Sequence, residues 1–428
     1  MEKDVIKQLI SEYQQKVTEI VFQERTYSLE DRLNYVFTGL RRAGKSYMMY
    51  QQIRQMLDAG HTKDEILYFN FEDDRIDSIT LSDLDRIKIC YEEMFDCKPV
   101  FFLDEIQIVD QWEKFTRRLA DQGYRVYVTG SNAQMLSSEI ATTLGGRYVI
   151  QNIYPYSFLE YLISLNIDVA DKNFIYRDRT RITKVYEVYF RYGGLPELLM
   201  VTDKRAWLSN LYQKIFLGDL ITRYQVRNAF ALQVLIRKLA ESVKQPTSFN
   251  RLASVVSSSG KKISTDTVID YLDYLSESWL IFSVENIAAK LVDKIANKKY
   301  YFTDNGILNL FLFDPVTSLL ENQVAIQLRR LFGAEIYYYQ HNIEVDFYVP
   351  SAQLAVQVCY SLSDNETRKR EIQALIKLSA HINVSTMLII TKDEEETIKE
   401  NGLSIRIIPV WKWLCEYISH TDQLNRSY

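Results

Sequence analysis

The chain reads Gly39-Leu40-Arg41-Arg42-Ala43-Gly44-Lys45-Ser46 between an apolar run at 35–38 and a helical pattern at 47–57. This stretch matches the pattern G-x-x-x-x-G-K-[ST] of a phosphate-binding loop, in the strand-to-helix setting that the chemistry requires. Glycines allow the sharp bend by which backbone N–H groups surround a polyphosphate, and the helix points its positive end at the phosphates. A chance glycine–lysine turn is the alternative. We expect this loop and Tyr47 to bind a nucleotide, with Lys45 on the β- and γ-phosphates and Ser46 on Mg²⁺.

The composition is that of a globular protein with several domains. With 428 residues, the chain is too long for one hydrophobic core, and its fractions of hydrophobic (47%) and charged (25%) residues are ordinary. A formal charge of -5 argues against coating of nucleic acid through the overall field, although it leaves room for a local basic patch. Cys90, Cys97, Cys359 and Cys415 lack C-x-x-C spacing and regular pairing, which favours buried thiols in a reducing compartment without a zinc site.

The N-terminus begins with charge, Met1-Glu2-Lys3-Asp4, and continues as an amphipathic pattern to Ile20, unlike a signal peptide. No apolar stretch approaches the roughly 18 residues that a membrane span needs. We therefore expect a cytoplasmic protein without a membrane partner.

Residues up to 155 predict an α/β domain. Short β-rich runs alternate with helical patterns, which is typical of a parallel sheet covered on both faces. The apolar run at 100–103 ends in Asp104-Glu105, as expected of a central strand that delivers two carboxylates to the top of the sheet. Asp104 is placed to hold Mg²⁺ through water, and Glu105 to orient and deprotonate the attacking water; a solvated strand end is the alternative. The predicted strands are 35–38, 66–70, 100–103, 125–129 and 148–150.

The acid pair favours ATP over GTP. A switch GTPase would show Asp-x-x-Gly at this place and a base-reading Asn/Thr-Lys-x-Asp elsewhere. The chain has Asp104-Glu105-Ile106-Gln107 instead, and it contains no instance of the second motif.

Two further segments are candidates for sensing the γ-phosphate. Thr129-Gly130-Ser131-Asn132 follows a strand, so Ser131 and Asn132 could contact the nucleotide and report hydrolysis; an ordinary helix N-cap explains the pattern equally well. Leu144-Gly145-Gly146-Arg147 places an arginine after a flexible turn. Arg147 could reach the γ-phosphate of its own subunit or, in a homo-oligomer, of a neighbour, and a plain surface arginine is the alternative.

Together these motifs resemble the successive blocks of prokaryotic ATPases of the AAA+ superfamily, archaeal-ATPase-like group. The order and spacing match over roughly residues 30 to 160. The resemblance implies ATP and Mg²⁺ as ligands, Asp104 as the magnesium-associated acid and Glu105 as the catalytic base. The matching blocks are 40–46, 102–107 with Trp112 after them, 128–132, 144–148 and 154–158.

The middle of the chain predicts helices followed by a winged helix. Helical patterns fill 156–245, a lid or linker interrupted by the turn Tyr192-Gly193-Gly194-Leu195-Pro196-Glu197. Residues 246–300 give a helix, a turn, a second helix and a β-like exit, an order that indicates a winged helix. Acidic residues on the second helix disfavour its entry into a DNA groove, so a packing module is the alternative. The lysines expected to contact a DNA backbone are Lys261, Lys262, Lys290, Lys294, Lys298 and Lys299.

Residues 301–428 reproduce the element order of the PD-(D/E)XK nuclease fold. With the block Tyr301-Phe302-Thr303-Asp304-Asn305-Gly306, this part is similar to a C-terminal domain of uncharacterised function usually attached to these ATPases. A nuclease of this fold needs an Asp on one strand and an acid-x-Lys on the next, because two carboxylates hold the metal and the lysine stabilises the reacting water. Asp346 fits, but Gln357 and Cys359 occupy the other two positions. We expect an inactive nuclease-like domain in which Glu321 and Asp346 are remnants or structural groups.

The sequence thus predicts an α/β fold with four parts: an AAA+ type P-loop ATPase domain (1–155), a helical lid (156–245), a winged-helix-like region (246–300) and a nuclease-like domain (301–428). The expected function is an ATPase switch that couples ATP hydrolysis to a C-terminal module for DNA or a protein client. The alternative is a DNA-processing protein whose nuclease-like domain binds or cleaves nucleic acid.

Overall fold

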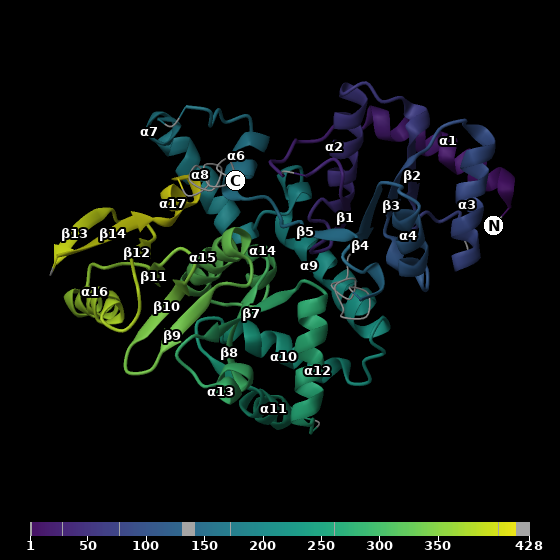
Figure 1. Cartoon of the computed structure of the whole chain (residues 1–428). Helices are drawn as coiled ribbons and strands as arrows, with labels where there is room; N and C mark the ends of the chain where they lie inside the picture. Colours follow the sequence, from purple (N-terminus) through teal and green to yellow (C-terminus); the bar gives the residue numbers. More distant parts are fainter. Residues whose placement is uncertain are drawn as a thin grey trace. The chain divides into compact units, whose positions relative to one another are not determined.

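The computed structural model describes residues 2–27, 29–76, 78–130, 142–171, 173–260, 262–400 and 402–416. The chain divides into two compact units (Figure 1). The first unit is Met1–Tyr154 with Glu277–Trp279, and the second is Pro155–Ser276 with Leu280–Tyr428. None of the described helices is long and apolar enough to span a membrane.

The first unit contains a five-stranded parallel sheet with the strand order β2-β3-β4-β1-β5. Each of the five predicted strands is present, and the expectation of a parallel α/β sheet is confirmed. Because every strand runs the same way, all carboxyl ends meet at one edge, where ligands of such sheets bind. The strands are β1 (Asn34–Thr38), β2 (Ile66–Asn70), β3 (Val100–Asp104), β4 (Val126–Gly130) and β5 (Tyr148–Asn152).

Helices cover this sheet because its strands have apolar side chains on both faces. Phe37, Phe69 and Phe101 are fully buried in three different strands. The helix that follows the phosphate-binding loop packs against β1 and β4, and the N-terminal helix packs against β2. The helices are α1 (Lys3–Glu19), α2 (Lys45–Asp58), α3 (Leu81–Met94) and α4 (Trp112–Asp121), with short 3₁₀ turns at Lys63–Glu65 and Ile106–Ile108.

The second unit begins with helices, as the sequence predicts for 156–245. The first of them starts in a capping box, in which Ser157 accepts from the N–H of Glu160 and the Glu160 carboxylate accepts from the N–H of Ser157. The helices are α6 (Phe158–Ser164), α7 (Phe174–Arg177), α8 (Arg179–Tyr192), α9 (Lys204–Lys214), a π-helical stretch at Ile215–Thr222 and α10 (Ala229–Glu241), with a 3₁₀ turn at Pro196–Leu199.

A nine-stranded, mostly antiparallel sheet follows, with the order β13-β14-β12-β11-β10-β9-β7-β8-β6. This sheet continues across residue 300, where the sequence suggests a domain boundary, because β7 pairs with β8 on one side and with β9 on the other. The strands are β6 (Thr247–Ser248), β7 (Ile281–Asn286), β8 (Asn297–Phe302), β9 (Tyr337–Gln340), β10 (Glu344–Val349), β11 (Leu354–Val358), β12 (Thr386–Thr391), β13 (Glu396–Glu400) and β14 (Leu403–Pro409).

The helices between these strands have the order that the sequence predicts. A helix, a turn and a second helix precede the antiparallel pair β7 and β8, and the later sequence α15-β9-β10-β11-α16-β12 is present as well. The winged-helix and nuclease-like assignments themselves remain predictions. The helices are α11 (Phe249–Ser258), α12 (Thr265–Glu277), α13 (Leu291–Ala296), α14 (Asn305–Leu308), α15 (Val316–Phe332), α16 (Asn365–Ser379) and α17 (Val410–Glu416).

The turn after α8 is fixed by a buried aspartate. The carboxylate of Asp304 accepts hydrogen bonds from the backbone N–H groups of Gly194 (2.9 Å), Gly306 (2.8 Å) and Ile307 (3.4 Å). Burial raises the pKa of Asp304 to about 6, and the three N–H groups oppose that shift. Gly193 has φ +77°, and a Cβ there would lie 2.0 Å from Asp304 Oδ1. Gly193 therefore lets the backbone approach the acid closely, and Gly194 passes close to the carbonyl oxygen of Tyr156, 2.3 Å from where its Cβ would lie.

We predict that Gly193→Ala destabilises the second unit by about 2–4 kcal/mol, because the methyl group meets Asp304 and the left-handed backbone is strained. Gly218→Ala is the matched control, since a Cβ there has open space and a helical backbone. Its effect should be within about 1 kcal/mol of zero. Urea unfolding midpoints of both variants test this, and equal midpoints would contradict the role given to the turn.

Candidate functional site

The phosphate-binding loop joins β1 to α2 at the carboxyl edge of the parallel sheet. Gly39 has φ +150°, and a Cβ on it would lie only 2.1 Å from the carbonyl oxygen of Ile153, so this position excludes a side chain. Lys45 is buried, and its ammonium donates to the carbonyl oxygens of Gly39 and Leu40, at 3.2 Å each. The lysine therefore lies against the curve of its own loop.

Asp104 ends the central strand β3 and meets hydroxyl groups from three other elements. Ser46 Oγ donates to Asp104 Oδ1 over 3.1 Å, the Tyr68 hydroxyl donates to Oδ2 over 2.6 Å, and Thr129 also donates to Oδ1. The convergence follows from the strand order, because β2 and β4 flank β3. Burial and the neighbouring Glu105 raise the pKa of Asp104, and the three hydroxyl groups oppose that shift.

The arrangement fits a magnesium ion. Mg²⁺ prefers hard oxygen ligands and is usually held by one or two protein groups plus phosphates and water. Ser46 and Asp104 supply a hydroxyl and a carboxylate oxygen side by side. In the parts of the chain that the structure describes, no group of three or more His, Cys, Asp or Glu side chains could hold a metal ion without such outside ligands.

Glu105 follows Asp104 in a left-handed backbone conformation, with φ +55°. Its N–H donates to the Thr129 hydroxyl over 2.8 Å, and its carboxylate accepts from the amide of Gln107. A residue with a side chain adopts this conformation at an energetic cost, and such positions are concentrated at functional sites. Thr129 is hydrogen-bonded to both acids and links them to β4.

Tyr47 and Arg41, which are also predicted for this site, contact residues outside the acid pair. Ser131 and Asn132 lie outside the described residues. Tyr47 is half exposed and its ring contacts Tyr50, and Arg41 forms an ion pair with Glu72 over 3.3 Å. A role for either in nucleotide binding remains a prediction.

The suggested reach of Arg147 to its own phosphate loop is wrong. Arg147 precedes β5, its carbonyl accepts from Asn34 at the start of β1, and its guanidinium pairs with Asp121. The phosphate-binding loop follows the other end of β1, and a strand of five residues separates the two ends by about 15 Å. This exceeds the extent of an arginine side chain, and the variant in which Arg147 acts on a neighbouring subunit remains a prediction.

The sequence gives no sign of two residues near the loop. Tyr68 lies within an apolar strand and looks like an ordinary core tyrosine, yet its hydroxyl contacts Asp104. Arg25, from the segment before β1, is buried and donates to the carbonyl of Ala43 in the loop. No known spacing links either residue to the motif.

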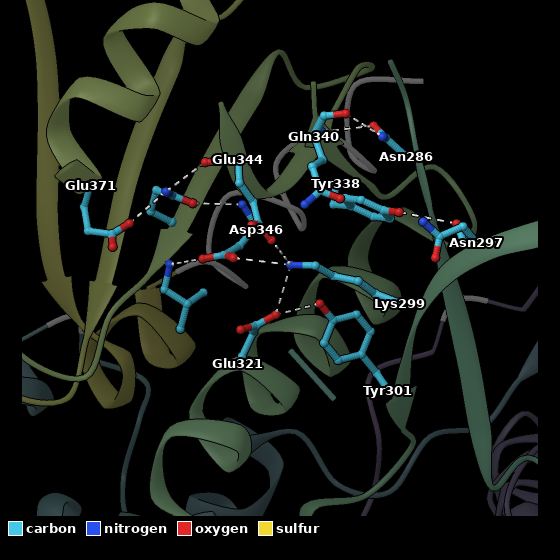
Figure 2. Close-up of polar contacts among 12 residues, drawn as sticks. Asn286, Asn297, Lys299, Tyr301, Glu321, Tyr338, Gln340, Glu344, Asp346 and Glu371 are labelled. Atoms are coloured by element: carbon cyan, nitrogen blue, oxygen red, sulfur yellow. Dashed lines mark hydrogen bonds and ion pairs between the residues drawn. The ribbon is translucent and has the colours of Figure 1, made fainter. Parts of the chain in front are cut away.

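The second unit contains a separate cluster of charges around Lys299 (Figure 2). The ammonium of this fully buried lysine lies 3.5 Å from Glu321, 3.2 Å from Glu344 and 3.4 Å from Asp346. Lys299 comes from β8, Glu321 from α15, and Glu344 and Asp346 both come from β10. Burial by itself lowers the pKa of Lys299, but the three carboxylates raise it above its ordinary value, so the ammonium stays charged.

Gln357 and Cys359 do not supply the charges that a nuclease needs at their positions. The Gln357 side chain accepts from the N–H of Asp346 (2.8 Å) and donates to Glu371 (2.8 Å), so it links β10 to α16. The Cys359 thiol donates to the carbonyl of Ser361, and burial raises its pKa to about 11. A neutral amide and a neutral thiol therefore stand where the acid and the lysine would be.

A cavity of about 930 Å³ opens beside this cluster. Acidic groups (Glu321, Glu344, Asp346 and Glu371) and basic groups (Lys244, Arg251, Arg370 and Lys377) both line it. Charged groups of both signs therefore line the same cavity.

The expectation that Lys299 contacts DNA is wrong, because the side chain has no exposed surface. Its neighbour Lys298 is partly exposed and pairs with Glu285 over 2.9 Å. Side chains alternate along a strand, so two adjacent lysines point to opposite faces. Glu371 is also a group that sequence reasoning missed, because its role depends on the contact of α16 with Gln357.

We predict that Lys299→Met destabilises the second unit by about 3–5 kcal/mol, because it leaves the buried carboxylate of Glu321 and the mostly buried one of Asp346 without their cation. Lys298→Met, one residue away, removes only a partly exposed ion pair and should cost about 1 kcal/mol or less. Urea unfolding of the two variants measures the difference. Equal stabilities would show that the buried cluster does not hold the unit together.

Two family models and two relatives match this chain. An AAA domain family matches residues 31–162, and a domain of unknown function matches residues 183–316. An uncharacterised protein of Methanocaldococcus jannaschii is 34% identical over 399 residues, which cover 89% of this chain and 88% of the relative. An uncharacterised protein of Haemophilus influenzae is 31% identical over 394 residues, which cover 89% of this chain and 94% of the relative.

Among solved structures, the Walker-type ATPase of Pyrococcus abyssi matches with a TM-score of 0.39 and 14% identity, covering 72% of this chain and 95% of that chain. The resemblance to AAA+ ATPases is confirmed for the first unit by the family match, whereas the nuclease-like assignment of the C-terminal part is not confirmed. The chain belongs to the family of these two uncharacterised proteins, and residues 31–162 are its AAA domain.

Proposed function

We propose that this protein binds ATP with Mg²⁺ at the loop 39–46 and hydrolyses it. The observation that supports this most directly is the contact of 3.1 Å between Ser46 Oγ and Asp104 Oδ1. This contact joins the serine at the end of the phosphate-binding loop to the aspartate of the central strand. In P-loop enzymes, these two groups hold Mg²⁺. Bound there, Mg²⁺ would neutralise charge on the β- and γ-phosphates.

Lys45 and Glu105 have separate tasks in this proposal. The Lys45 ammonium would exchange its contacts with the carbonyls of Gly39 and Leu40 for phosphate oxygens, which attract a cation more strongly. Glu105 would orient the attacking water and accept its proton, since it stands next to Asp104 and is not fully buried.

Thr129 is the residue through which we propose that the nucleotide state reaches the rest of the domain. Its hydroxyl donates to Asp104 and accepts from the N–H of Glu105. A cation at Asp104 competes with the first of these hydrogen bonds, so its arrival would alter the position of β4 relative to both acids. In this way a local change in charge can alter a longer segment.

We predict that Lys45→Ala abolishes ATP turnover, and that Glu105→Gln binds ATP but turns it over about 10²–10⁴-fold more slowly. Lys98→Ala and Glu113→Gln are matched controls, because these residues lie in the same unit and outside the proposed site. Steady-state phosphate release and binding of a fluorescent ATP analogue measure the two effects. Turnover that survives in both site variants would refute the proposal.

Binding of DNA by the second unit is a second candidate function. The basic side chains that line the cavity favour it, because Lys244, Arg251, Arg370 and Lys377 gather there from segments far apart in the sequence. Such groups bind a phosphate backbone through charge, and this binding weakens as the salt concentration rises, because the release of condensed counterions becomes less favourable. The acidic residues of α12 argue against a role for that helix in a groove.

If DNA binds there, we predict that Arg251→Ala combined with Lys377→Ala weakens binding and lowers the slope of log K against log salt by about two. Lys399→Ala, an exposed lysine on β13, should change neither. Fluorescence anisotropy with labelled single- and double-stranded oligonucleotides in EDTA measures both quantities. No binding by the unaltered protein, or equal effects of all variants, would remove this candidate.

A further inference from the structure

The element order of the C-terminal part implies a divalent cation held by acids from β10 and its neighbours. The acids are present and they converge on a common point. That point is occupied by the Lys299 ammonium, 3.2 to 3.5 Å from oxygens of Glu321, Glu344 and Asp346. These residues therefore do not fit a metal ion in the same place, because the lysine already occupies it.

Lys299 has no route away from the acids. Its side chain is fully buried, and its strand is paired with β7 through the contact of Lys299 with Val284. The ammonium also lies 5.4 Å from the centre of the Tyr338 ring, whose face attracts a cation. Figure 2 shows the lysine extending from β8 between Glu321 and Asp346, with Tyr338 alongside. A metal ion could displace this group only if the strand moved.

Two of the three acids also accept a hydrogen bond from the protein itself. Asp346 Oδ2 accepts from the N–H of Val358 over 2.9 Å, and Glu321 Oε1 accepts from the Tyr301 hydroxyl over 2.8 Å. Glu371, the nearest further acid, is held by Gln357 and Arg370. Fixed donors therefore orient Asp346 and Glu321 toward the ammonium, whereas Glu344 is partly exposed.

We propose that the Lys299 ammonium is the resident cation of this cluster and excludes Mg²⁺ and Mn²⁺ from it. A divalent ion ligated by Glu321, Glu344 and Asp346 together would have to stand at the point where the ammonium already lies, and two cations cannot share that place. The cavity of the second unit is therefore a site that works without a metal ion. This inference is independent of ATP hydrolysis in the first unit.

The first test leaves Lys299 in place. Manganese binding is measured by electron paramagnetic resonance of free Mn²⁺ in the full chain with Asp104→Asn, which removes the acid of the first unit. Adding Asp346→Asn should leave the number of bound Mn²⁺ ions unchanged. A bound ion that is lost on adding Asp346→Asn would overturn the proposal.

The second test removes the lysine from the same Asp104→Asn background. Lys299→Ala should gain one bound Mn²⁺, and Mn²⁺ should raise its melting temperature, because a metal ligated by Glu321, Glu344 and Asp346 replaces the lost charge. Ligand oxygens lie about 2.1 Å from an ion of this type, so the three carboxylates would have to move inward only a little from their present distances to the ammonium. Glu344 can do so because its side chain is partly exposed.

Two controls make the second test specific. Lys298→Ala should gain no ion, and Lys299→Ala with Asp346→Asn should lose the ion that Lys299→Ala gains. A folded Lys299→Ala protein that gains no Mn²⁺ would contradict the assignment. If Lys299→Ala does not fold, the first test decides the question by itself, because both of its proteins retain the lysine.

Discussion

Burying a carboxylate is costly unless donors satisfy its oxygens, and this constraint governs the interior of both units. Three buried positions meet it with three kinds of donor. Asp104 receives hydroxyl groups, Asp304 receives backbone N–H groups, and Glu321 with Asp346 receives an ammonium. The donors differ in how readily they can be exchanged, and this difference separates a site that can accept ligands from one that holds the fold.

Hydroxyl groups are neutral and can rotate, so the donors on Asp104 can yield to a cation and return. The N–H groups on Asp304 belong to the backbone of a turn and a helix start, so that contact holds two segments together and has no freedom to change. Lys299 brings a full charge that is enclosed on all sides. Of the three positions, only Asp104 has the adaptable surroundings that a nucleotide cycle needs.

The sequence is most informative where local pattern and function coincide. The central strands are predicted because burial on both faces requires continuous apolar runs, and the loop because its glycines and lysine have fixed spacing. The pattern of residue types along the chain does not predict contacts between segments that are distant in the sequence. Lys299 follows another lysine and resembles part of an exposed basic run, and only the alternation of side chains along β8 separates the two. The groups that donate to Asp304 belong to the backbone, so the residue types in the sequence do not reveal them.

The nine-stranded sheet has a consequence for how this protein can change over evolution. Lys299 belongs to β8, whereas its acids lie on α15 and β10, beyond residue 300. A gene exchange with a joint near that residue would deliver the acids without their cation, or the cation without its acids. The segments on either side therefore depend on each other, and a swap of either part would leave buried charge without its partner.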